Sequence, residues 1–225
     1  MTEFFNRLLS ALVFHDDQSA LIPELKLQTY PPGYHFETAD AVSSSVYFIC
    51  SGVAGVIARN NNSGAAGIAL VGQEGMTGAA LAFGVGVSAH DYVALTSCDA
   101  YALEAGRLTE AFARSPNMRL LVIRYFYDLA AQFAGSAFAN ARQTADAKIA
   151  RMLLMLQDRL PQPLPITHAQ LALMLGTRRP GVTLALQTLE GMGYIRAGRG
   201  KISVVDRDGL IEMSDGVYSA AERQG

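Results

Sequence analysis

Four residues between positions 178 and 187 have the types and the spacing that base recognition in DNA requires. Arg179, Thr183 and Gln187 recur at intervals of four, so a helix would carry them along one line, with Arg178 beside them at its start. Arginine pairs bidentately with guanine in the major groove, and Thr and Gln bond other base edges. The spacing therefore predicts an exposed helix that reads bases. The alternative is an ordinary helical hairpin with a solvated basic face.

Two helices and a turn must position this face. A first helix is expected to begin at Thr167, which forms a Thr-x-x-Gln capping box with Gln170, and to end at Gly176. A second helix follows with Pro180 in its first turn, where a missing N–H costs nothing. Its expected buried side consists of Val182, Ala185, Leu186 and Leu189. Two helices that meet at a glycine turn and lock through a branched apolar residue are typical of a helix-turn-helix.

A basic hairpin is expected to follow the second helix. Residues 194–195 and 202–205 alternate as two strands, joined by the glycine-rich turn 196–201, which carries three cations. Cations in such a turn suit phosphates rather than base edges. We therefore assign Arg199 and Lys201 to contacts with the DNA backbone. Thr167, at the start of the first helix, is also expected to contact DNA.

From Thr167 to Ile202 the chain resembles the winged helix-turn-helix of Crp/Fnr-type bacterial transcription regulators. The resemblance rests on the capping box, the glycine turn, the paired arginines and the apolar spacing of the second helix. It implies three partners: double-stranded DNA with a pseudo-palindromic operator, a second copy of the chain, and RNA polymerase. It also places Arg179 on an arginine that reads guanine in the family. Pro180 and Leu184 stand where relatives have charged base readers, so we expect a different operator sequence.

The same resemblance implies an α+β fold with three parts. We expect a β-roll sensor-like domain at 1–114, a long dimerisation helix at 115–141 and a winged helix-turn-helix DNA-binding domain at 142–225. The roll would be antiparallel and similar to cyclic-nucleotide-binding domains. The residues alone predict an antiparallel sandwich or barrel, because short apolar runs alternate with turn signals. These runs are 25–30, 46–50, 53–59, 67–71 and 92–97, and the clearest hairpin tip is Asn60–Gly64.

The segment 115–141 combines two apolar sides on one helix. Seven residues follow alternating four- and three-residue steps, which is typical of a coiled-coil seam. They are Met118, Val122, Tyr125, Leu129, Gln132, Ser136 and Ala139. We expect this seam to face the same helix of a second copy, while Leu121, Phe126 and Phe133 pack on the β-roll. The alternative is that all of these residues pack within one chain.

The segment 72–83 corresponds, by the resemblance, to the loop and short helix whose N–H groups hold a cyclic-nucleotide phosphate. Gly75 and Gly78 keep the shape of that loop. Ala79 stands in place of the family's ribose-binding glutamate, and residues 85–93 contain no arginine for the phosphate. His90 is the only nearby side chain that could compensate, and an unperturbed histidine is mostly neutral at pH 7. We therefore expect a degenerate or re-purposed effector pocket that does not bind cyclic AMP.

The charge distribution agrees with a basic C-terminal part that binds DNA and an acidic N-terminal part. Residues 142–225 carry 11 Lys and Arg against 8 Asp and Glu, whereas residues 1–141 carry 7 against 12. This asymmetry favours a sensor or dimer body joined to a DNA-binding head. We find no catalytic constellation in the sequence, and we expect neither an enzyme nor a cofactor. The second function class is a small-molecule-sensing signalling module whose winged domain binds protein rather than DNA.

Metal, redox and membrane roles are not favoured. Cys50 and Cys98 lie in apolar stretches without metal-ligand spacing, so we expect buried free thiols. The run His15-Asp16-Asp17 could hold a metal, but a solvated turn is the favoured interpretation. The first residues lack a basic segment before an apolar run, and no apolar run reaches about 18 residues. We therefore expect a cytoplasmic protein without a signal peptide or a transmembrane helix.

Overall fold

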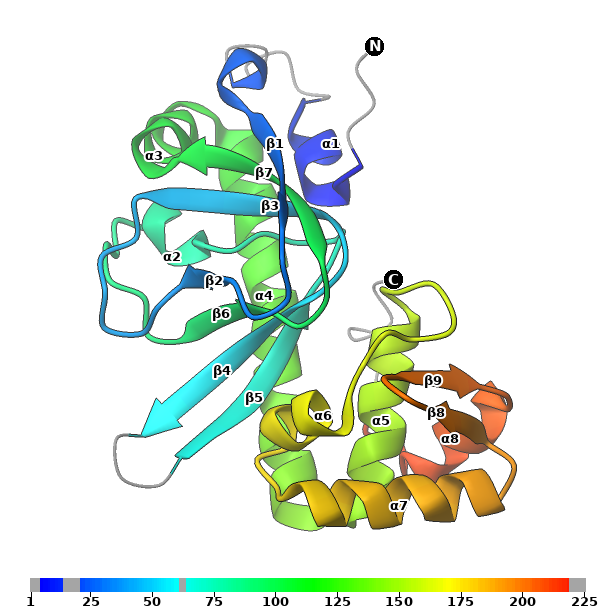
Figure 1. Cartoon of the computed structure of the whole chain (residues 1–225). Helices are drawn as coiled ribbons and strands as arrows, with labels where there is room; N and C mark the ends of the chain where they lie inside the picture. Colours follow the sequence, from blue (N-terminus) through cyan, green and yellow to red (C-terminus); the bar gives the residue numbers. More distant parts are fainter. Residues whose placement is uncertain (1–4, 14–20, 61–63, 219–225) are drawn as a thin grey trace. The chain divides into compact units, whose positions relative to one another are not determined.

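The computed structural model describes residues 5–13, 21–60 and 64–218, which separate into two compact units (Figure 1). The first unit draws on Met1–Val56 and Val71–Leu129, and the second on Ile57–Leu70 and Ala130–Gly225. The His15–Asp17 turn and most of the hairpin tip predicted at Asn60–Gly64 lie outside the described residues. No helix of the described ranges is both long and apolar enough to cross a membrane.

The strands before the long helix form two sheets. One has the order β1-β7-β3 and the other the order β2-β6-β4-β5. The strands are β1 (Lys26–Tyr30), β2 (His35–Glu37), β3 (Ser45–Ser51), β4 (Ala54–Asn60), β5 (Gly64–Val71), β6 (Asp91–Ala94) and β7 (Cys98–Glu104). Strand β7 pairs antiparallel with both β1 and β3, and β2 pairs antiparallel with β6. Together with the long helix and the C-terminal helix-turn-helix, these sheets confirm the predicted α+β fold.

Elements that were not expected from the sequence include β2, β7, the helix α3 (Ala105–Arg114) and the helix α8 (Arg207–Met213). Strand β7 lies between two partner strands, yet its apolar run, Ala100–Leu103, is only four residues long and is flanked by Asp99 and Glu104. Helix α3 has Leu108 buried and Ala111 and Phe112 half-buried, so its apolar positions do follow helical spacing, but over only ten residues. In so short a stretch a few apolar residues do not separate a helix from a strand.

In the first unit, close packing explains one glycine of the effector-like loop. Helix α1 (Arg7–Val13), helix α2 (Ala79–Ala82) and the start of the long helix share one buried cluster. The Tyr125 hydroxyl donates to the Met76 carbonyl at 2.7 Å. A Cβ atom at Gly75 would lie 2.5 Å from the Tyr125 ring, so a side chain at 75 would push the long helix away. Gly75 is therefore required for packing in this chain.

The long helix α4 (Pro116–Arg142) forms where it was expected, and Leu121 and Phe126 pack in the first unit as predicted, against its buried cluster and against Phe83. The predicted seam, however, does not face outward. All seven predicted seam residues are buried within the chain itself, with exposed fractions of at most 8%. A different line of residues is exposed at alternating three- and four-residue steps. We call it the exposed α4 stripe: Leu120, Ile123, Tyr127, Ala130, Ala134 and Ala137. The assignment of the Met118–Ala139 seam to a second copy was therefore wrong.

The polar residues of the former seam have a role within the second unit. Strand β5 is an edge strand, so one side of its backbone lacks a partner strand. The Gln132 side chain accepts from the Leu70 N–H at 3.0 Å and donates to the Leu70 carbonyl at 3.2 Å. The Ser136 hydroxyl donates to the Ile68 carbonyl at 2.8 Å. These bonds satisfy buried backbone groups that would otherwise cost about 1–3 kcal/mol each.

The remaining elements of the second unit surround the helix α5. They are α5 (Ala145–Gln157), α6 (His168–Met174), α7 (Arg179–Gly191), β8 (Ile195–Gly198), β9 (Lys201–Val204) and α8 (Arg207–Met213) (Figure 1). The Thr144 hydroxyl caps α5 by accepting from the Ala147 N–H at 3.3 Å. Arg207 joins α8 to the end of α5 through an ion pair of 2.7 Å with Asp158. Helix α5 packs against both α7 and α8, which fixes the scaffold of the helix-turn-helix.

Candidate nucleic-acid interface

Helix α6 begins with the predicted capping box. The Thr167 hydroxyl accepts from the Gln170 N–H at 3.2 Å, and the Gln170 side chain accepts from the Thr167 N–H at 2.8 Å. Each side chain satisfies a backbone donor that the first helical turn leaves without a partner. Gly176 follows the end of the helix at a φ of +57°, the left-handed conformation expected there. The predicted start and end of this helix are confirmed.

Helix α7 carries the predicted buried side and leaves the predicted reading face mostly in solvent. Val182, Ala185, Leu186 and Leu189 are buried. Arg178, Arg179 and Gln187 are exposed, whereas Thr183 is half-buried. Arg179, Thr183 and Gln187, four residues apart, therefore lie along one side of α7, with Thr183 set deeper, and Arg178 is the exposed N-cap residue at the start of the helix. We refer to α7 as the reading helix.

The half-buried position of Thr183 results from its contacts with the helix before it. Its hydroxyl donates to the Arg179 carbonyl at 3.1 Å within the reading helix. The same oxygen lies 3.0 Å from Nδ1 of His168, the first residue of α6. Nothing in the sequence spacing predicts this contact across the turn. His168 is therefore a residue of the interface that the sequence did not identify.

The wing is a tighter hairpin than the sequence predicted. Strands β8 and β9 pair from Ile195 with Val204 to Gly198 with Lys201, so the turn consists of residues 199–200 rather than 196–201. Arg199 and Lys201 are both exposed at this tip. The predicted six-residue turn was wrong because glycine and basic residues have a low preference for strands. In the structure the turn needs only two residues, since Gly200 adopts the required positive φ of +71°.

Two sets of hydrogen bonds fix the wing to the rest of the unit. The Ala197 N–H donates to the Glu190 carboxylate at 2.9 Å, which ties β8 to the end of the reading helix. Leu164 exchanges both backbone bonds with Ile202, at 2.8 and 3.0 Å, and so extends the wing by a β-bridge. The wing is therefore anchored through β8 to the reading helix and through β9 to Leu164.

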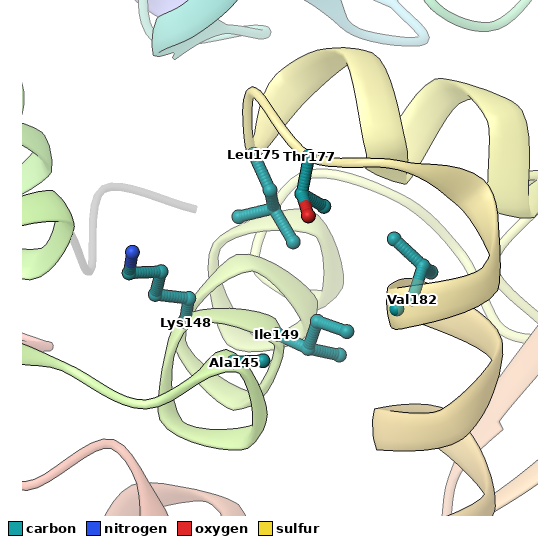
Figure 2. A pocket seen from close by; sticks show the side chains of 7 residues that line it. Ala145, Lys148, Ile149, Leu175, Thr177 and Val182 are labelled. Carbon is teal, nitrogen blue, oxygen red and sulfur yellow. The ribbon is translucent and has the colours of Figure 1, made fainter.

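A small cavity lies behind the reading helix. Its volume is about 90 Å³, and it is lined by Ala145, Lys148, Ile149, Leu175, Thr177, Gly181 and Val182. Figure 2 shows Ile149, Leu175 and Val182 turned toward one gap between α5, the turn after α6 and the reading helix. A cavity of this volume fits a packing gap better than an effector site, because ligand pockets measure about 300–1,000 Å³.

In the first unit, the effector-like loop holds an internal carboxylate. Gly78 precedes α2 at a φ of +71°, and its N–H donates to a carboxylate oxygen of Glu37. Glu37 lies in β2 and is only 6% exposed. Burial raises the pKa of Glu37, and the Gly78 N–H and the Ser88 and Thr77 hydroxyls partly offset this rise. Sequence reasoning missed Glu37 because β2 itself was not expected.

The other loop residues do not add a positive charge. Ala79 is buried. Burial lowers the pKa of His90 below its ordinary value, so the imidazole is neutral at pH 7. A neutral imidazole cannot replace the phosphate-binding arginine of cyclic-nucleotide-binding relatives. Of the effector-like residues, Gly75 and Gly78 thus shape the loop, while Ala79 and His90 leave it without a cation of their own.

Both cysteines lie in buried surroundings, with Asp99 as a charged neighbour. Cys50 and Cys98 are free and buried, as predicted. Burial is the main cause that raises the pKa of each thiol to about 11, so both stay protonated near neutral pH. Within the described ranges, no group of three or more His, Cys, Asp or Glu side chains could hold a metal ion.

Comparisons with known proteins agree with this architecture. Residues 147–213 match the sequence model of the Crp-like helix-turn-helix domain. A search of the curated proteins finds no match. A Crp/Fnr-family transcription regulator of Thermus thermophilus is 22% identical, with a TM-score of 0.68 over 85% of this chain and 99% of that chain. FixK2 of Bradyrhizobium japonicum is 16% identical, with a TM-score of 0.71 over 84% of this chain and 96% of that chain.

A third structure, the c-di-GMP-responsive global regulator CLP of Xanthomonas campestris, is 16% identical to this chain. Its TM-score is 0.68 over 84% of this chain and 97% of its own. At these identities the likeness shows the fold, and the match to residues 147–213 shows the domain. The chain therefore carries a Crp-like helix-turn-helix domain on the fold of the Crp/Fnr transcription regulators, as its sequence predicts.

Proposed function

We propose that this chain is a homodimeric transcription regulator that binds a specific DNA sequence and has a degenerate or re-purposed effector pocket. The observation that carries the proposal is the reading helix. Val182 and Leu186 anchor one side of it, and Arg178, Arg179 and Gln187 stand exposed on another. An exposed helix face with arginine at its start suits the major groove. RNA polymerase as a partner and a cytoplasmic location stay predictions from the sequence.

The proposal gives each part of the chain a task. We assign sensing to 1–114, dimerisation to 115–141 and DNA binding to 142–225. The exposed wing residues Arg199 and Lys201 would contact phosphates beside the groove. Phosphate contacts set the position of the protein on the duplex, and base contacts select the sequence.

The exposed α4 stripe supports a second copy of the chain as the partner of α4. Leu120 and Ile123 are half exposed, and 74% of Tyr127 is exposed. Apolar residues at three- and four-residue steps form a seam that pairs with the same seam of another helix. The alanines at 130, 134 and 137 would let the two α4 helices approach closely in their C-terminal halves.

The experiment that tests the proposal is selection of bound duplexes from a random DNA library by the full chain. We expect one sequence to be enriched, and its binding to weaken steeply with salt because phosphate contacts release counterions. A winged domain that contacts protein instead would enrich no sequence and would show no salt-dependent affinity for duplex DNA.

Cyclic AMP is expected not to act on this protein at micromolar concentration. A bound phosphate would have to displace Glu37 from the Gly78 N–H, and would meet no arginine in 85–93. One missing charge-assisted bond of about 1.5–3 kcal/mol corresponds to roughly a ten- to hundredfold loss of affinity.

Calorimetric titration with cyclic AMP and cyclic GMP checks this expectation. The selected operator serves as the control, because its binding shows that the same preparation is folded and active. Micromolar binding of either nucleotide, together with a shift in operator affinity, would mean that the pocket uses other contacts.

A further inference from the structure

The reading helix exposes apolar groups beside its arginines. Leu184 is 67% exposed, and Pro180 and Gly181 next to it are also exposed. These residues share the open side of α7 with Arg178 and Arg179. An apolar surface bordered by cations fits a partner that offers both methyl groups and phosphates. The major groove of DNA offers both, because thymine places its C5-methyl group there.

The contacts of Thr183 point to the same chemistry. A hydroxyl has a single hydrogen, and here it is donated to the Arg179 carbonyl. The contact of 3.0 Å with His168 Nδ1 is then satisfied when the imidazole is the donor. The Thr183 oxygen is thus bonded on two sides within the protein. The hydroxyl hydrogen and one of the two lone pairs are used within the protein, which leaves the γ-methyl group and one lone pair to meet a base.

We infer that the reading helix recognises thymine methyl groups beside the guanine that Arg179 contacts. Leu184 and the methyl group of Thr183 make these contacts, and His168 is a positioning residue that holds the Thr183 hydroxyl away from the groove. The inference rests on the proposed DNA binding and specifies what the bound sequence contains. Apolar contact with a thymine methyl distinguishes A·T from G·C without a hydrogen bond.

The test replaces each thymine of the selected operator, one at a time, by deoxyuridine. This change removes the C5-methyl group and keeps every hydrogen-bonding group of the base. We expect two positions in each half-site at which wild-type affinity falls about fourfold, the value for one buried methyl group. Deoxyuridine at the other positions should leave the affinity unchanged.

Variants of Leu184 and Thr183 show which of the two residues contacts which deoxyuridine-sensitive position. Leu184→Ala should abolish the deoxyuridine effect at one position, and Thr183→Ser should abolish it at the other. Thr183→Val, which keeps the methyl group and removes the hydroxyl, should retain both effects. Met192→Ala is the matched control, because it removes an exposed apolar side chain at the end of the same helix, and it should also retain both.

His168 is tested through the same readout. His168→Leu removes the donor to Thr183 and should reduce the deoxyuridine effect at the Thr183 position alone. His168→Asn places an amide N–H near the position of Nδ1 and should restore it. A residue with a merely structural role would change the affinity for the thymine and deoxyuridine operators equally.

Three results would overturn the inference. Deoxyuridine without effect at every position would exclude methyl recognition while leaving the enriched operator, and thus the proposed function, intact. An effect kept by Thr183→Ser and lost in Thr183→Val would mean that the hydroxyl reads the base. A library selection that enriches no sequence would remove the proposed function and this inference together.

Discussion

Replacing Arg179 by alanine is expected to weaken binding to the selected operator by about 1–3 kcal/mol and to relax its sequence preference. Arg179 is exposed in the first turn of the reading helix. In a helix-turn-helix the residues at the start of the recognition helix contact base edges, so a guanidinium at this position would be able to reach them. Bidentate pairing with guanine depends on the planar fork of arginine, which alanine lacks. Binding to random duplex should change much less, because that binding depends mainly on phosphates.

Lys201→Ala is the matched control for this prediction. Lys201 is exposed at the wing tip, at a position suited to phosphates. Its removal should weaken binding to all duplexes alike and reduce the salt slope by about 1. Fluorescence anisotropy on operator and random duplexes at several salt concentrations separates the two patterns. Equal losses on operator and random DNA for Arg179→Ala would remove Arg179 from base readout.

Ile123→Glu is expected to convert the protein from dimer to monomer at micromolar concentration. Ile123 lies in the exposed α4 stripe and is half exposed in the single chain, so the substitution should leave the protomer folded. In a dimer the carboxylate would be buried without a partner, which costs several kcal/mol per ion. Each 1.4 kcal/mol is tenfold in the dissociation constant, so a shift of about a hundredfold or more is expected.

Light scattering gives the mass of each variant, and thermal unfolding gives its melting temperature. Two control variants are compared with Ile123→Glu by both methods. Ala113→Glu places the same charge at an exposed position of α3, and should leave both the mass and the melting temperature unchanged. Leu129→Asp places a charge at a position buried within the chain, so it should lower the melting temperature sharply. A dimer that survives Ile123→Glu would contradict the assignment of the stripe.

The helix-turn-helix was predictable because its signals are local. A capping box at Thr167 and Gln170, a glycine at 176 and a proline at 180 each fix the backbone within one or two turns. Such signals do not depend on what the rest of the chain does. This is why the boundaries and the buried side of the reading helix agree with the sequence interpretation.

The faces of α4 could not be predicted in the same way. Spacing identifies which residues share a side of a helix, but the partner that covers each side depends on tertiary structure. Gln132 and Ser136 suggested a polar seam between helices, whereas they bond the edge of β5. Glu37 was missed for a related reason, since its partner at Gly78 lies 41 residues away in the chain.

The most direct test of a dimer that reads DNA with two copies of α7 is the arrangement of the enriched operator. Two reading helices related by a twofold axis require two inverted half-sites with centres about 34 Å apart, one turn of the double helix. We predict this inverted repeat, with a binding stoichiometry of two chains per duplex. A single, non-repeated site bound by one chain, or no enriched sequence at all, would contradict the account.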